Sequence, residues 1–114
     1  MTIWIIADDF TGANDSIVPF AVAGARAVTI AQPPEQKEAF PAYQAVAVNT
    51  NSRGRPREEA YQLAQQAGKD LPLQAGDLVY KKIDSALRGN IGAEIDGLLA
   101  GLGEETIVLG APAF

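Results

Sequence analysis

Short apolar runs recur along this 114-residue chain, and they constrain its fold more than any other feature. Each run is rich in β-branched residues and is bounded by polar or turn-forming residues. The runs occupy residues 2–7, 27–31, 45–49, 78–83 and 106–110. Continuous rather than alternating apolarity is typical of strands covered on both faces, so the pattern predicts a mainly parallel sheet of about five strands.

Helical patterns fill most of the intervals between these runs. The clearest predicts a helix over residues 91–102, with Asn90 able to cap its start and Gly103 able to end it. Its apolar stripe consists of Ile91, Ile95, Leu98, Leu99 and Leu102. Strands alternating with helices predict right-handed βαβ units, and hence an α/β fold that is a three-layer, doubly wound sandwich.

Three weaker helical segments complete this prediction. Residues 12–23 contain Pro19, from which we expect a kink or a late start. Residues 60–67 follow Pro56, which fits a first helical turn, and Gly68 is expected to end that helix. A short helical turn is expected over residues 33–40.

The composition limits the chemistry that the chain can support. With no cysteine and no histidine, it cannot use a disulfide, the usual zinc or haem ligands, a thiol nucleophile or a histidine-based triad. Acidic residues outnumber basic ones by 14 to 9, which argues against a nucleic acid or a membrane surface as partner. A small molecule is the expected partner.

The two ends of the chain carry further expectations. Residues 1–7 have no basic leader and are too short to span a bilayer, so we expect a buried strand and a cytoplasmic protein. No helix follows the last expected strand, which would leave one sheet face open. We therefore expect residues 1–114 to be the front part of a longer protein.

Polar segments follow the expected strands, at residues 7–15, 49–55 and 81–92. Ligands of open α/β sheets bind outside the carboxyl ends of the strands, so these segments form the candidate site. Basic residues gather in or beside them: Arg53, Arg55, Arg57, Lys81, Lys82 and Arg88. The expected ligand is a small anion.

Asp8 and Asp9 end the first strand and precede a helix. One carboxylate can cap that helix. Adjacent side chains of an extended chain point in different directions, so the other carboxylate can reach a ligand, as an acceptor for hydroxyls or as a general base. Capping alone is the alternative.

The other two segments supply the cations. Arg53 stands among amide and hydroxyl side chains, where its guanidinium can bind a carboxylate bidentately; an ordinary turn is the alternative, with Arg55 and Arg57 solvated. Lys81 and Lys82 face opposite sides of a strand, so one is expected in the site and the other at the surface.

The segment at 81–92 also opens the clearest helix. Arg88 and Gly89 stand beside the free amides of its start, which predicts an anion site, while Asp84 is expected to pair with a neighbouring Lys or Arg. Neither a G-x-x-x-x-G-K-[ST] nor a G-x-G-x-x-G motif occurs, so no nucleotide cradle is recognised.

At these loops the chain resembles the four-carbon acid sugar kinases, ATP-dependent enzymes that phosphorylate tetronates such as erythronate, threonate and their 3-oxo relatives. The matching stretches are IADDFTGAND at 6–15, VNTNSR at 48–53, YKKIDSALRGNIGAE at 80–94 and APAF at 111–114. Ala86 stands where the family usually has threonine, so the hydroxyl of that position is missing here.

The resemblance implies an amino-terminal domain that binds the acid sugar, with ATP and Mg²⁺ bound mainly by a carboxyl-terminal kinase domain absent from this chain. By matching position, it implies Asp8 and Asp9 for substrate hydroxyls or base duty, Ser52 and Arg53 for the acid sugar, and Lys82, Asp84 and Arg88 for its carboxylate and the incoming phosphoryl group. The chain alone is expected to lack kinase turnover.

A stand-alone binding module for a small organic acid or a phosphorylated metabolite, without catalysis, is the alternative function. The sequence leaves open whether the protein forms a homo-oligomer.

Overall fold

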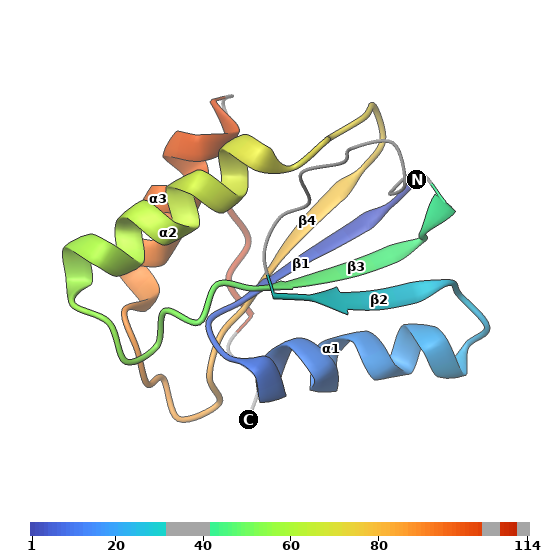
Figure 1. The fold of residues 1–114 in the computed structure, drawn as a ribbon, viewed down its shortest axis with the longest axis horizontal. Helices are drawn as coiled ribbons and strands as arrows, with labels where there is room; N and C mark the ends of the chain where they lie inside the picture. The colour runs from blue at the N-terminus through green and yellow to red at the C-terminus, as the bar shows by residue number, and fades with distance from the viewer. Residues whose placement is uncertain (32–41, 104–107, 112–114) are drawn as a thin grey trace.

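A computed structural model describes residues 1–31, 42–103 and 108–111. Its elements are β1 (Ile3–Ala7), α1 (Phe10–Val22), β2 (Ala27–Ile30), β3 (Ala45–Asn49), α2 (Arg57–Asp70), β4 (Leu78–Lys82) and α3 (Ile91–Leu102). All strand pairs are parallel, in the order β2-β3-β1-β4. In Figure 1, α1 covers one face of the sheet and α2 and α3 cover the other. The predicted three-layer α/β fold is confirmed.

The sheet is smaller than predicted. Over the described residues it has four strands instead of about five. The expected fifth strand, at 106–110, falls partly outside these residues, and its described part at 108–110 is not a strand. The helical turn expected over 33–40 lies outside the described residues.

The two central strands fill two cores with alternate residues. Trp4, Ile6, Val46 and Val48 pack under α2 and α3 against Ala64, Leu71 and Leu98. Ile5, Ala7, Ala45 and Ala47 pack under α1 against Ala13 and Ile17. Because β1 and β3 are covered on both sides, neither face of these strands can be polar, which explains their continuous apolar runs.

The helices differ from prediction in their bounds. α1 begins at Phe10, before the expected start, and continues past Pro19. α2 continues past Gly68 to Asp70, so Gly68 does not end it. A Cβ at Gly68 would lie 2.8 Å from the Leu98 carbonyl oxygen, and one at Gly97 would collide with the Tyr61 carbonyl oxygen. These glycines allow the backbones of α2 and α3 to approach closely.

Asp77 joins the amino ends of β1 and β4. Its carboxylate accepts hydrogen bonds from the backbone N–H of Thr2 at 2.8 Å, from the backbone N–H of Gln74 at 3.0 Å and from Trp4 Nε1 at 3.1 Å. Burial acts to raise the pKa of Asp77, but these donors outweigh it and hold the pKa below its ordinary value. The amino end of the sheet is thus tied together by neutral donors.

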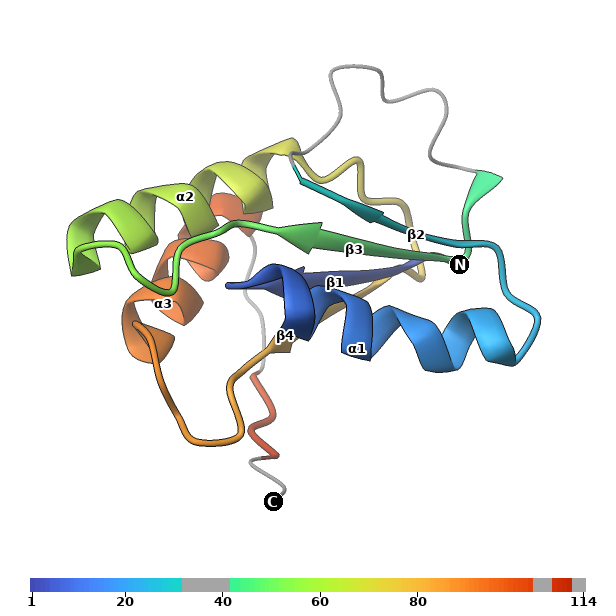
Figure 2. The ribbon, with the colours of Figure 1, turned by 60° about the horizontal axis from the view of Figure 1, so that its bottom comes forward.

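The connections leave β1 and β3 in opposite directions. From β1 the chain passes through α1 to β2, and from β3 it passes through α2, on the other face, to β4. Figure 2 shows the loops after β1, β3 and β4 at one end of the sheet. The neighbouring carboxyl ends of β1 and β3 form the switch point at which such sheets bind ligands. No described helix is long and apolar enough to span a bilayer.

Candidate functional site

The loop after β3 is bonded to the end of β1 by its backbone. The Thr50 backbone N–H and Oγ1 both donate to the Ala7 carbonyl oxygen, at 2.9 and 3.0 Å. The backbone N–H groups of Ser52 and Arg53 donate to the Asp8 carbonyl oxygen, at 3.0 and 3.2 Å. These bonds place the Arg53 side chain beside the two aspartates that follow β1.

Arg53 lies at the centre of a cluster of three carboxylates. Its Nη2 and Nε bond Asp8 Oδ1 and Oδ2 at 3.0 and 3.2 Å, and its Nη1 lies 3.0 Å from Asp9 Oδ2. Its Nη2 also lies 3.5 Å from Asp84 Oδ1. The hydrogen bond with Asp8, with the other carboxylates, raises the pKa of Arg53, so the guanidinium stays protonated. We call Asp8, Asp9, Arg53, Asp84 and Arg88 the arginine–carboxylate cluster.

Asp84 brings the loop after β4 into this cluster. Its Oδ2 accepts from Arg88 Nε at 2.8 Å, from the Arg88 backbone N–H at 3.1 Å and from the Ala86 backbone N–H at 3.2 Å, while Oδ1 accepts from Arg88 Nη2 at 2.9 Å. The Arg88 hydrogen bonds hold the pKa of Asp84 well below its usual range. The predicted pairing of Asp84 with a neighbouring basic residue is confirmed.

The two aspartates after β1 take different positions. Asp9 caps α1, because its Oδ1 accepts from the Gly12 backbone N–H at 2.8 Å. Asp8 is turned inward, with 4% of its side chain exposed against 28% for Asp9. Gly89, at φ +89°, covers Asp8 so closely that a Cβ would lie 2.8 Å from Asp8 Oδ2. A ligand can therefore approach Asp9 more readily than Asp8.

A second, buried network supports the loop after β3. Ser52 Oγ lies 2.6 Å from Thr50 Oγ1 and donates to Glu94 Oε1 at 2.9 Å. Lys81 Nζ lies 3.4 Å from the same carboxylate oxygen. Ser52 and Glu94 are almost completely buried. The Ser52 hydroxyl is thus engaged inside the protein, and its expected contact with a substrate stays a prediction.

The sequence did not predict the buried pair of Glu94 and Lys81. Glu94 lies one helical turn before Leu98, on the face of α3 that packs against the sheet. A carboxylate on a buried helix face needs a partner. The place of Glu94 in the apolar face of the predicted helix is therefore the signal that could have revealed its pairing. The cap predicted at Asn90 is also absent, since its side chain donates to the Arg55 carbonyl oxygen at 2.8 Å instead.

The two lysines of β4 face opposite sides, as predicted, but neither side chain lies free at the surface. Lys81 reaches Glu94 with 11% of its side chain exposed. Lys82 is half-buried, and its Nζ donates to the Ile83 carbonyl oxygen. It lies beside the start of α1, where a Cβ on Gly12 would be 3.6 Å from Lys82 Cγ. Lys82 therefore stands next to the residue that Asp9 caps.

The cluster offers both signs of charge to a ligand. Arg53 and Arg88 are paired with carboxylates, so they form no free cationic clamp; Arg88 nevertheless leaves 67% of its side chain exposed. Two non-glycine residues with positive φ also lie in these loops, Asn51 at 50° and Leu87 at 58°. Such conformations cluster at functional sites. The arrangement can donate hydrogen bonds to an acid and accept them from a hydroxyl.

The site residues do not fit a resident metal ion. Although three carboxylates surround Arg53, no three acidic side chains within residues 1–31, 42–103 and 108–111 are arranged so that they could hold a metal ion together. The oxygens of Asp8 and Asp84 already accept hydrogen bonds from the two arginines.

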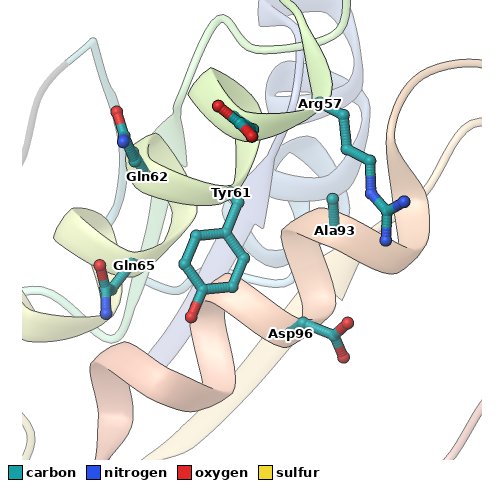
Figure 3. Close-up of a pocket in the computed structure, with 7 residues that line it drawn as sticks. Arg57, Tyr61, Gln62, Gln65, Ala93 and Asp96 are labelled. Carbon is teal, nitrogen blue, oxygen red and sulfur yellow. The ribbon is translucent and has the colours of Figure 1, made fainter.

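A separate hollow of about 510 Å³ lies on α2 and α3 and shares no residue with the arginine–carboxylate cluster. Figure 3 shows Tyr61 and Arg57 of α2 beside Asp96 and Ala93 of α3. Its surface is open and its polar side chains come from helix faces rather than from strand ends.

Comparison with known proteins gives a consistent result. The family described as a sugar-binding N-terminal domain matches residues 3–114. A D-erythronate kinase from Heliobacterium modesticaldum is 38% identical over 96% of this chain and 25% of its own length. A D-threonate kinase from Salmonella typhimurium is 36% identical over 97% and 26%, and a 3-oxo-tetronate kinase from Methylobacterium radiotolerans is 36% identical over 96% and 26%.

A solved structure supports the fold. A domain of unknown function from Bordetella bronchiseptica, crystallised with bound citrate as a domain-swapped dimer, superposes with a TM-score of 0.78 at 34% identity, over 91% of this chain and 27% of that one. The chain thus spans about a quarter of the length of the relatives it matches.

Proposed function

The chain belongs to the family of sugar-binding N-terminal domains, and we propose that it binds the substrate of an ATP-dependent kinase for four-carbon sugar acids. The observation that carries the proposal is the meeting of Asp9, Arg53 and Arg88 at the switch point of the sheet. Tetronate kinases of the same family, matched over almost all of this chain, supply the substrate class.

In the proposed reaction, this domain holds the acceptor. When the sugar acid binds, its carboxylate replaces an internal carboxylate as the acceptor of hydrogen bonds from the arginines, chiefly from the exposed Arg88. Asp9 accepts a hydrogen bond from the reacting hydroxyl and takes its proton as the oxygen bonds to the γ-phosphorus of ATP, whose bond to the β,γ-bridging oxygen breaks so that ADP leaves. Lys82 pairs with Ala7 across β1 and β4, next to the two aspartates, and its positive charge stabilises the incoming phosphoryl group. Fixed geometry of this kind lowers the barrier mainly by positioning.

ATP and Mg²⁺ are assigned to the carboxyl-terminal part of the longer protein. Relatives about four times as long as this chain support that division, as does the poor fit of the cluster to a metal ion. The chain by itself then binds substrate without turning it over. A cytoplasmic location belongs to the same proposal, because the reaction consumes ATP.

Calorimetry with D-erythronate and D-threonate tests the proposal on the chain as it stands. We expect binding to the wild type and a loss of roughly tenfold or more in affinity for Arg88→Ala, since a charge-assisted hydrogen bond contributes about 1.5–3 kcal/mol. The variant Asp9→Asn removes the carboxylate that faces the reacting hydroxyl but keeps the helix cap, because Asn caps as well as Asp does. Absence of binding to either tetronate, or phosphorylation of a tetronate by this chain with ATP, would contradict the proposal.

A binding module without catalysis is the second candidate, favoured by the citrate bound to the Bordetella bronchiseptica domain. Such a module would bind acids by charge and ignore hydroxyls. Equal affinity for the tetronates and for succinate, an acid without hydroxyls, with no effect of Asp9→Asn, would select it.

A further inference from the structure

A second hollow adjoins the arginine–carboxylate cluster at the carboxyl ends of β2 and β3. Its volume is about 580 Å³, within the range of roughly 300–1,000 Å³ typical of ligand pockets. Phe10, Val48 and Leu63 give it apolar walls, and Asn49, Asn51 and Arg55 give it polar ones. Phe10 directly follows Asp9, and Asn51 directly precedes Ser52 and Arg53. We call this hollow the β2–β3 pocket.

Asn49 lines this pocket, and its side-chain oxygen and nitrogen are used differently. Its side-chain oxygen accepts from the Asn51 backbone N–H at 2.9 Å, which fixes the orientation of the amide. Within the described part of the chain, its Nδ2 has no hydrogen-bond partner. The residue is 9% exposed and is one of those that line the pocket.

Asn51 stands beside it in a constrained conformation. Its φ of 50° is a left-handed value that asparagine tolerates better than most residues. Thr50 and Ser52, on either side, are bonded to β1 and to Glu94. The exposed Asn51 side chain is thus carried on a rigid frame, which a binding site needs to hold a small ligand.

We infer that the β2–β3 pocket binds the hydroxylated carbon chain of the sugar acid, with Asn49 and Asn51 bonding its hydroxyls and Phe10 lying against its carbons. An amide offers both donors and an acceptor, so it matches a hydroxyl, which is itself both. The inference rests on the proposed function and deepens it. It assigns the selection of hydroxylated over plain acids to two asparagines outside the arginine–carboxylate cluster.

The test compares two probes on matched variants. D-erythronate carries hydroxyls, whereas succinate is a four-carbon acid without them. Asn51→Gly removes the amide and keeps the left-handed backbone accessible. Asn49→Asp keeps the acceptor for the Asn51 N–H and removes the donors. Gln62→Ala, in the hollow of Figure 3, is the control on a surface outside the pocket.

Calorimetry should show that Asn51→Gly weakens D-erythronate binding about tenfold, since a lost hydrogen bond of roughly 1.4 kcal/mol corresponds to that factor. Succinate affinity should not change, and Gln62→Ala should alter neither. Unchanged D-erythronate affinity, or an equal loss for both probes, overturns the inference while leaving the proposed function in place. Failure of the wild type to bind any tetronate would instead overturn the proposed function.

Nuclear magnetic resonance of the wild type decides the matter if a variant does not fold. Saturation with D-erythronate should shift the side-chain amide resonances of Asn49 and Asn51 and leave that of Gln62 in place. A saturated protein in which neither asparagine amide moves would overturn the inference.

Discussion

Carboxylates lie at both ends of the sheet, but they are satisfied in different ways. At the amino end, Asp77 accepts from two backbone N–H groups and the Trp4 indole. At the carboxyl end, Asp8, Asp9 and Asp84 are held by Arg53 and Arg88. Both arrangements lower a carboxylate pKa, yet only the second gathers charged side chains of both signs.

We propose that this difference separates a structural role at the amino end from a functional role at the carboxyl end. Neutral donors are sufficient to join two strands, as Asp77 shows. Holding Arg53 beside the nearly buried Asp8 and Asp84 costs desolvation that joining two strands does not require. Perturbed charged groups that gather at one edge of a sheet are typical of binding and catalytic sites. At the carboxyl end, we therefore expect the carboxylate of a substrate to replace an internal carboxylate as the partner of an arginine.

The largest expected effect comes from removing the centre of the charged end. Arg53→Met leaves Asp8 buried without its cation, and we expect a loss of about 3 kcal/mol in the free energy of unfolding. Urea denaturation measures it. The double variant Arg53→Met/Asp8→Asn should recover part of that loss, because the uncompensated charge is gone. A double variant less stable than Arg53→Met alone would show that charge is not the cause.

Glu94→Gln should have a smaller effect. It keeps the shape of the side chain and removes the charge that faces Lys81, so we expect a loss of about 2 kcal/mol in unfolding free energy. Adding Lys81→Met removes the second charge and should restore stability partly. If the two substitutions were simply additive, Glu94 and Lys81 would not be coupled and the buried network would need another explanation.

The smallest expected effect contrasts the two ends directly. Asp77→Asn should cost about 1 kcal/mol in unfolding free energy and leave tetronate affinity unchanged. Asp84→Asn should lower tetronate affinity, because it releases Arg53 and Arg88 from their positions. Equal effects of both variants on affinity would contradict the separation of a structural end from a functional one.

The same pair predicts a dependence on pH. Asp77 and Asp84 have a lower pKa in the folded protein than the value of about 4 expected in the unfolded chain. Their stabilisation is therefore present above about pH 4 and is lost as the pH falls through the folded pKa. Urea unfolding should show the stability gap between the wild type and Asp84→Asn at pH 6, and the gap should narrow between pH 4 and pH 2.

Much of the fold follows from local pattern. The helix predicted over 91–102 is α3 with the same bounds, because apolar spacing and a left-handed Gly103 are both local signals. The covered strands β1 and β3 were evident from uninterrupted apolar residues. Gly68 was misjudged, since its absent side chain serves a contact with α3 rather than the end of a helix.

The candidate site, like the fold, could be predicted from the sequence only in part. Its residues could be gathered in advance, because parallel strands bring their carboxyl-end loops to one edge. The pairing of Asp84 with a nearby basic residue could also be predicted, but the partners of Arg53 could not, since they lie on separate loops. The inward turn of Asp8 and the burial of Glu94 also depend on contacts between distant segments.

The order of residues along the chain thus determined the layers, the strands and the edge at which polar side chains collect, because those follow from periodicity and from turn chemistry over a few neighbours. Only the tertiary structure decided that the arginines are held by internal carboxylates, and that a pocket opens beside them. Pairing and cavities arise where loops far apart in sequence meet, and their energies depend on distances that no local pattern contains.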